Sequence, residues 1–91
     1  MVVCPLQVGF ELMSPVFCFS VHADASPSVL PRVLEVFALH NFVPERCHCQ
    51  RSGRSGEDLV IDVQLGGVTA GEAAAVAKRL GRVVDVMSVL W

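Results

Sequence analysis

The sequence predicts an α+β domain over residues 15–91, with the element order strand, helix, strand, strand, helix, strand. Two segments indicate strands, because apolar residues alternate with other residues at 16–22 and 58–65. Two further segments indicate helices, because apolar residues recur at helical spacing after Ser26 and again after Thr69. Right-handed connections in this order give the ferredoxin-like βαββαβ unit, a four-stranded antiparallel sheet with both helices on one face.

The first strand of this domain, VFCFSVH at 16–22, should turn one face toward the helices. The residues on that face alternate along the strand and are Phe17, Phe19 and Val21. Residues 1–14 form an N-terminal extension in which LQVGFEL, at 6–12, alternates in the same way. We expect an extra strand there, paired with a sheet edge of its own chain or of a neighbour.

The first helix is predicted to begin at Pro27, because serine is favoured just before a helix and proline as its first residue. Pro31 still lies near the first turn, where its missing N–H costs little. Asn41 is expected to end the helix in a left-handed conformation. The apolar stripe that should face the sheet consists of Val29, Leu30, Val33, Leu34, Val36 and Phe37.

The second half of the domain supplies three strands and a second helix. Thr69 and Glu72 fit a capping box, so a helix is predicted to begin after Thr69 and to end at Gly81. The strands and the loop between the first two are FVPERCHCQR (42–51), the hairpin loop SGRSGE (52–57), DLVIDVQL (58–65) and VVDVMSVLW (83–91). Three arginines around the hairpin predict a solvated loop, with a phosphate or partner contact as the alternative.

The segment RCHCQR, at 46–51, raises the question of a metal or redox site. In a strand, Cys47 and Cys49 share one face and His48 takes the other, so one ion could not bind all three without a bulge. Zinc sites usually use spacings that fold back through a turn, and no second ligand pair is present. We therefore expect no metal and no cofactor. Both cysteines are predicted to be small hydrophobes beneath the helices, with His48 on the open face of the sheet.

The composition limits the classes of partner. The net charge of −2 and the pI of about 5.8 argue against nucleic acid and anionic membranes, and no apolar run is long enough for a membrane span. Apolar residues make up 53% of the 91 residues, which predicts a homodimer or a larger assembly. The N-terminus does not resemble a signal peptide, so the four cysteines are interpreted as reduced thiols of a cytoplasmic protein.

The sequence shows no catalytic motif, and we expect no catalytic residues. His22, Asp24 and Ser26 cluster after the first strand, but surface and helix-capping roles explain them better than hydrolysis. Neither a G-x-S-x-G elbow nor a phosphate-binding loop is present. The residues alone therefore predict a protein that is not an enzyme.

Two segments resemble a known family. SVLPRVLEVFALHNF, at 28–42, resembles the first helix of the ACT domain, a regulatory amino-acid-binding module. AKRLGRVVDVMSV, at 77–89, is similar to the last helix and strand of acetolactate synthase small subunits. The matching residues are Ser28, Val29, Leu30, Arg32, Val33, Phe37 and Phe42 in the first segment, and Leu80, Val84, Asp85, Val86 and Met87 in the second.

The resemblance implies a non-catalytic regulatory protein with an ACT fold. It most resembles the short, single-domain small subunits that modulate an amino-acid biosynthesis enzyme such as acetolactate synthase. A free-standing homodimeric sensor of an amino acid or a related metabolite is the alternative. The implied partners are a second copy of the chain, a larger catalytic subunit and a small amino acid.

The resemblance also implies an effector site between two subunits, built from the loop before the first helix and the start of the second strand. The corresponding residues are Asp24, Ala25, Ser26, Ser28, Val29, Leu30, Phe42 and Val43. The family's usual asparagine, glycine and asparagine are here Ala25, Ser28 and Val43, and Pro44 removes a further donor. We therefore expect this site to be silent or to bind something less polar.

Overall fold

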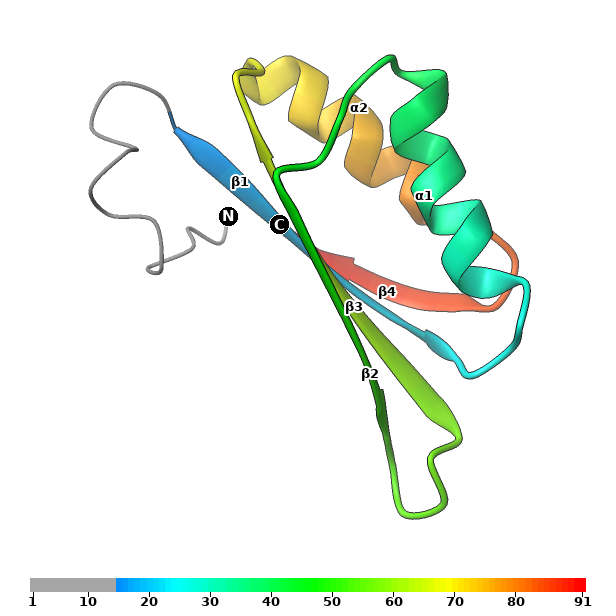
Figure 1. The fold of residues 1–91 in the computed structure, drawn as a ribbon. Helices are drawn as coiled ribbons and strands as arrows, with labels where there is room; N and C mark the ends of the chain where they lie inside the picture. The colour runs from blue at the N-terminus through cyan, green and yellow to red at the C-terminus, as the bar shows by residue number, and fades with distance from the viewer. Residues whose placement is uncertain (1–14) are drawn as a thin grey trace.

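The computed structural model describes residues 15–91, and the predicted element order is confirmed (Figure 1). The elements are β1 (Val16–Asp24), α1 (Val29–Leu39), β2 (Arg46–Ser52), β3 (Asp58–Gly66), α2 (Ala70–Leu80) and β4 (Val86–Leu90). All neighbouring strands pair antiparallel in the order β2-β3-β1-β4. The extra strand predicted in residues 1–14 lies outside the described residues.

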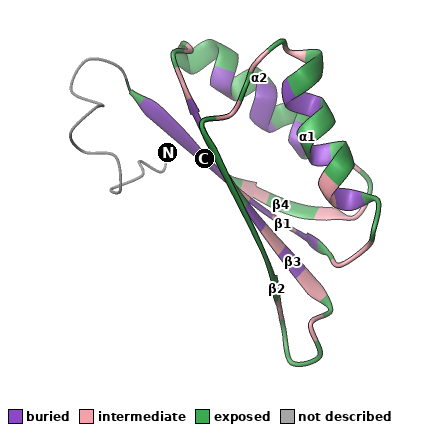
Figure 2. Cartoon of the chain, viewed as in Figure 1, coloured by how far each residue is buried: buried purple, intermediate pink, exposed green. Residues whose placement is uncertain are grey.

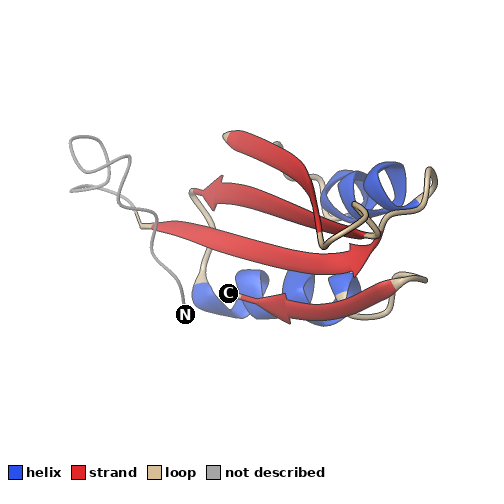
Figure 3. Ribbon diagram, turned by 90° about the horizontal axis from the view of Figure 1, so that it is seen from below, coloured by secondary structure: helices blue, strands red, loops and turns tan. Residues whose placement is uncertain are grey.

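Both helices cover the same face of the sheet, as the ferredoxin-like order requires (Figures 1 and 3). The core lies between the helices and β1 and β3. The predicted inward residues of β1 are all buried, and so are the alternating apolar residues of β3, which are Leu59, Ile61, Val63 and Leu65. At its centre the rings of Phe19 and Phe37 meet edge to face, 5.7 Å apart. The indole of Trp91 stacks on Phe19 at 6.2 Å, so the C-terminal residue closes the core. Neither described helix has the length and apolarity of a membrane span.

The first helix begins two residues later than the sequence predicts. The ladder between β1 and β3 continues as far as the pair Asp24 and Asp58, so the chain turns only after that pair. The turn is closed by Val29, whose N–H donates to the Ser26 carbonyl at 3.2 Å, and Pro27 therefore precedes the helix. Ser28 takes the cap position but makes no capping bond with its side chain. The pairing of β1 with β3 therefore outweighs the helix-start signal at Ser26 and Pro27.

The other helix signals are confirmed. Asn41 has a φ of 63°, and the Thr69–Glu72 capping box is formed in both directions, at 3.1 and 2.8 Å. The stripe on α1 is narrower than predicted, because Leu34 is 38% exposed. The last strand begins at Val86 instead of residue 83, since turns fill residues 81–85 and Asp85 has a φ of 74°.

Candidate functional site

The loop before α1 holds most of the predicted effector residues, and its backbone donors are largely used within the chain. Asp24 donates its N–H to the Asp85 carbonyl, and Ala25 donates to the Glu57 carbonyl, both at 2.9 Å. Ser26 donates its N–H to the Asp24 carbonyl at 2.8 Å, and its hydroxyl lies 3.3 Å from that of Ser28. A ligand carboxylate at this loop would therefore meet few free donors.

The remaining predicted site residues are apolar and lie in two different settings. Val29 is fully buried and Leu30 is half-buried against the core. Phe42 donates its N–H to the Phe37 carbonyl at 2.9 Å, and its ring stacks on His40 at 6.0 Å. Val43 is 86% exposed and offers no polar group.

The structure does not bring the two halves of the predicted site together within one chain. Residues 24–30 lie at the N-terminal end of α1, and Phe42 and Val43 follow its C-terminal end. At a rise of about 1.5 Å per residue, the 11 residues of α1 separate the two ends by roughly 16 Å. One amino acid cannot span that distance, so both halves could contact one ligand only if two chains each supplied one of them.

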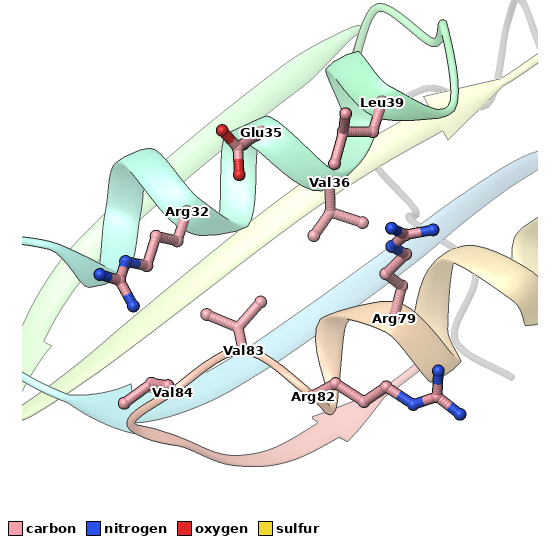
Figure 4. A pocket seen from close by; sticks show the side chains of 8 residues that line it. All are labelled: Arg32, Glu35, Val36, Leu39, Arg79, Arg82, Val83 and Val84. Atoms are coloured by element: carbon pink, nitrogen blue, oxygen red, sulfur yellow. The ribbon is translucent and has the colours of Figure 1, made fainter.

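A cleft between α1 and α2 was not predicted from the sequence (Figure 4). Its volume is about 740 Å³, within the range of small-molecule sites. The residues of α1 that line it recur at helical spacing, and the others come from the end of α2 and the turn after it. The lining consists of Arg32, Glu35, Val36, Leu39, Arg79, Arg82, Val83 and Val84.

The cleft combines positive charge with exposed apolar surface. Three guanidinium groups and one carboxylate give it a net charge of +2, in a chain whose net charge is −2. Among the described residues, none of these four charged side chains makes a hydrogen bond or an ion pair. Leu39 and Val84 are each 62% exposed beside them, whereas Val36 is buried and forms the floor. Such a lining can bind an acidic group that is attached to an apolar body.

The prediction that Cys47 and Cys49 are buried beneath the helices is wrong. They pair with Val63 and Ile61, which are fully buried, so the predicted face is correct. However, β2 is an edge strand that the helices do not cover, and both cysteines are exposed (Figure 2). They are free thiols, whereas Cys18 is disulfide-bonded, so the expectation of four reduced thiols is wrong for Cys18.

The chemically reactive side chains of the RCHCQR segment lie on two faces of β2. His48 lies opposite Asp62 on the open face, as expected. No group of three or more His, Cys, Asp or Glu residues within 15–91 is arranged to hold a metal ion. Partial desolvation of its sulfur raises the pKa of the Cys47 thiol, and the nearby charges of Cys49 and Asp62 raise it further.

We expect both exposed thiols to react with a small aromatic disulfide reagent in the folded protein. Only the thiolate attacks, so the raised pKa of Cys47 should slow its reaction at pH 8. The Cys49→Ser variant removes one of the charges that raise this pKa, so Cys47 should react faster in it than in the wild type, as measured by release of the coloured thiolate. A chelator should change neither rate, because we expect no stoichiometric zinc or iron. Protection of both thiols until the protein is unfolded would contradict their exposure.

Comparisons with known proteins identify the fold at low sequence identity. The ACT domain of the GTP pyrophosphokinase of Chlorobium tepidum superposes with a TM-score of 0.71 at 6% identity, over 86% of this chain and 97% of that domain. The C-terminal domain of the MgtC protein of Mycobacterium tuberculosis gives a TM-score of 0.66 at 12% identity, over 84% of this chain and 83% of that one.

A formyltetrahydrofolate deformylase of Pseudomonas putida gives a TM-score of 0.60 at 14% identity, over 84% of this chain but only 28% of that enzyme. No curated protein sequence matches. The ACT-like domain family itself matches residues 13–91, nearly the whole sequence. The chain therefore belongs to the ACT-like domain family.

Proposed function

We propose that this protein is a non-catalytic regulatory subunit of a larger amino-acid biosynthesis enzyme, with acetolactate synthase as the first candidate. The observation that carries the proposal is the match of the ACT-like domain family to residues 13–91, because domains of this type are generally regulatory. The likeness of residues 77–89 to acetolactate synthase small subunits supports the choice of enzyme. The protein would act in the cytoplasm as a homodimer or a larger assembly.

Self-association is supported by apolar surface that one chain leaves in water. Among the described residues, the exposed large hydrophobic side chains are Leu34, Leu39, Val43, Val84, Met87 and Leu90. They lie on α1, on β4 and in the segments after both helices. Burying such surface contributes about 25 cal/mol per Å², which favours a second copy or a partner subunit over exposure.

A second function, a free-standing homodimeric metabolite sensor, is supported by the cleft between α1 and α2. Its lining could bind a ligand without any catalytic partner. The two functions differ in what the purified chain does to an enzyme. A regulatory subunit changes the rate or the feedback inhibition of its catalytic subunit, and a sensor leaves both unchanged.

The test combines the purified chain with the purified acetolactate synthase catalytic subunit of the same organism. We expect the two to coelute in gel filtration and the enzyme's rate to change as the chain is titrated. Ala38→Asp changes an exposed residue of α1, so this variant should fold with an unchanged core and serves as the control. Failure to coelute, with no change of rate at tens of micromolar, would refute the assignment to this enzyme. Light scattering that shows only a 9.8 kDa species would refute self-association.

A further inference from the structure

We propose that the cleft between α1 and α2 is a binding site for a small organic monoanion, an acidic head group on an apolar body. The proposal does not depend on the catalytic partner, because the cleft lies within one chain. It also differs from the predicted effector loop, with which it shares no residue. The arginines define the head group of the ligand, the apolar lining defines its body, and the single carboxylate of the lining limits its charge.

The head group is defined by the arginines. Arg32, Arg79 and Arg82 are three of only seven Lys and Arg residues in the chain, and they line one cleft from α1, from α2 and from the turn after α2. Arg79 extends from α2 toward α1, whereas Arg82 points away from α1 (Figure 4). A guanidinium group donates two parallel hydrogen bonds to a carboxylate, sulfonate or phosphate oxygen pair. Arg79, which has no acidic partner in the described chain, is the donor that we assign, and Arg32, which points to the opposite end of the lining in Figure 4, adds positive charge.

The apolar body is defined by the four aliphatic residues of the lining. Val36 and Val83 lie between the arginines, and Leu39 and Val84 stand at the rims (Figure 4). Leu39 and Val84 are each 62% exposed, so a ligand that covers them removes apolar surface from water. A hydrated inorganic anion gains nothing from this surface, which is why the site should distinguish an organic anion from an inorganic one.

Glu35 limits the charge of the ligand. It is the only acidic residue of the lining, and it projects from the same helix as Arg32. A second anionic group on the ligand would approach this carboxylate, and like charges disfavour each other at short range. A ligand with one acidic group can satisfy the arginines and still keep its apolar body near Glu35. Glu35 therefore weakens, without reversing, the attraction of the cleft for a second acidic group on the ligand.

The experiment titrates the protein with anilinonaphthalene sulfonate, a fluorescent apolar monoanion, and with neutral phenylnaphthylamine, which has nearly the same body. We expect saturable binding of the sulfonate that the double variant Arg32→Ala, Arg79→Ala weakens at least about tenfold, since each lost charge-assisted bond has a large effect. Lys78→Ala removes one positive charge from the turn of α2 that holds Arg79, but Lys78 does not line the cleft, so binding should change by less than about twofold. Binding of the neutral probe should be equal in all variants.

Three further measurements decide the details. Naphthalene sulfonate should displace the fluorescent probe, and inorganic sulfate at the same concentration should not. Glu35→Gln should strengthen binding by about threefold, because it removes the opposing charge. The variants should melt at the temperature of the wild type, since all of these side chains are exposed.

Several results would overturn the proposal. These are unchanged binding in the double variant, an equal loss in Lys78→Ala, or displacement by inorganic sulfate. Each of these results would mean that the probe binds through positive charge in general, or at another part of the surface, and not in this cleft. Weaker binding in Glu35→Gln would refute the limit on ligand charge.

Discussion

The Val33→Asp variant is expected to be unfolded at 25 °C. Val33 is fully buried on the sheet-facing side of α1, within the core formed with β1 and β3. A carboxylate placed there loses its hydration, and burying such a group without a partner costs several kcal/mol. A domain of this size has a total stability of about 5–15 kcal/mol, and often less. The loss should therefore remove the cooperative transition in a urea titration followed by circular dichroism.

A matched control separates burial from the effect of aspartate on a helix. Ala38→Asp introduces the same residue into α1 at an exposed position, near the end of the helix. It should cost only about 1 kcal/mol, from lower helix propensity and an unfavourable charge at the C-terminal end. A Val33→Asp protein that remains soluble and unfolds cooperatively would mean that Val33 does not face the core.

The core of this fold could be predicted from the sequence, because the spacing of apolar residues within each helix or strand decides which of them face the core. Val33 and Phe37 fall on one side of a helix by spacing alone, and Phe19 falls on one side of a strand. The capping box of Thr69 and Glu72 also needs only four consecutive residues. Each of these features is decided within one element, and each was found where it was expected.

Features decided by the neighbours of an element were missed. The period of β2 gives the correct face for Cys47 and Cys49, but it cannot show that neither helix reaches over the edge strand. The start signal at Ser26 and Pro27 is displaced because the β1–β3 ladder runs on to Asp24. In both cases the deciding contact is with a distant part of the chain.

The cleft was missed for the same reason. Arg32 was noted only as part of the family pattern, while Arg79 and Arg82 lie more than 40 residues further along the chain. A stripe of Arg32, Glu35, Val36 and Leu39 at helical spacing was a usable signal, since charged and apolar residues are mixed on one side of the helix. It indicates a surface that is neither core nor simply solvated. Only the packing of α1 beside α2 turns that surface into a cleft.

The largest expected gain of function concerns the effector loop. Free valine, leucine and isoleucine should bind the wild type weakly or not at all, even at millimolar concentration. The N–H groups of Ala25 and Ser26 already donate within the chain, and the side chains of Ala25 and Val43 have no polar atom. Each unpaired charged end of the amino acid would cost roughly 1–3 kcal/mol or more once water is excluded.

The triple variant Ala25→Asn, Ser28→Gly, Val43→Asn should bind these amino acids at least about a hundredfold more tightly. Two added charge-assisted hydrogen bonds contribute about 1.5–3 kcal/mol each, and about 1.4 kcal/mol corresponds to a factor of ten in affinity. Ser28→Gly lets the ligand approach the backbone, and it should cost only a few tenths of a kcal/mol, because the Ser28 side chain makes no capping bond.

Because the two ends of α1 lie far apart, the predicted gain in affinity should also depend on the dimer. Ala25 and Val43 lie at opposite ends of α1, so one ligand can meet both new asparagines only across two chains. Isothermal titration should therefore show the gain where light scattering shows a dimer, and the gain should vanish on dilution to monomer. Val43→Asn alone, which changes a residue that is 86% exposed, should fold normally and gain little. Micromolar binding of valine by the wild type, or an equal gain in monomer, would place the effector site elsewhere.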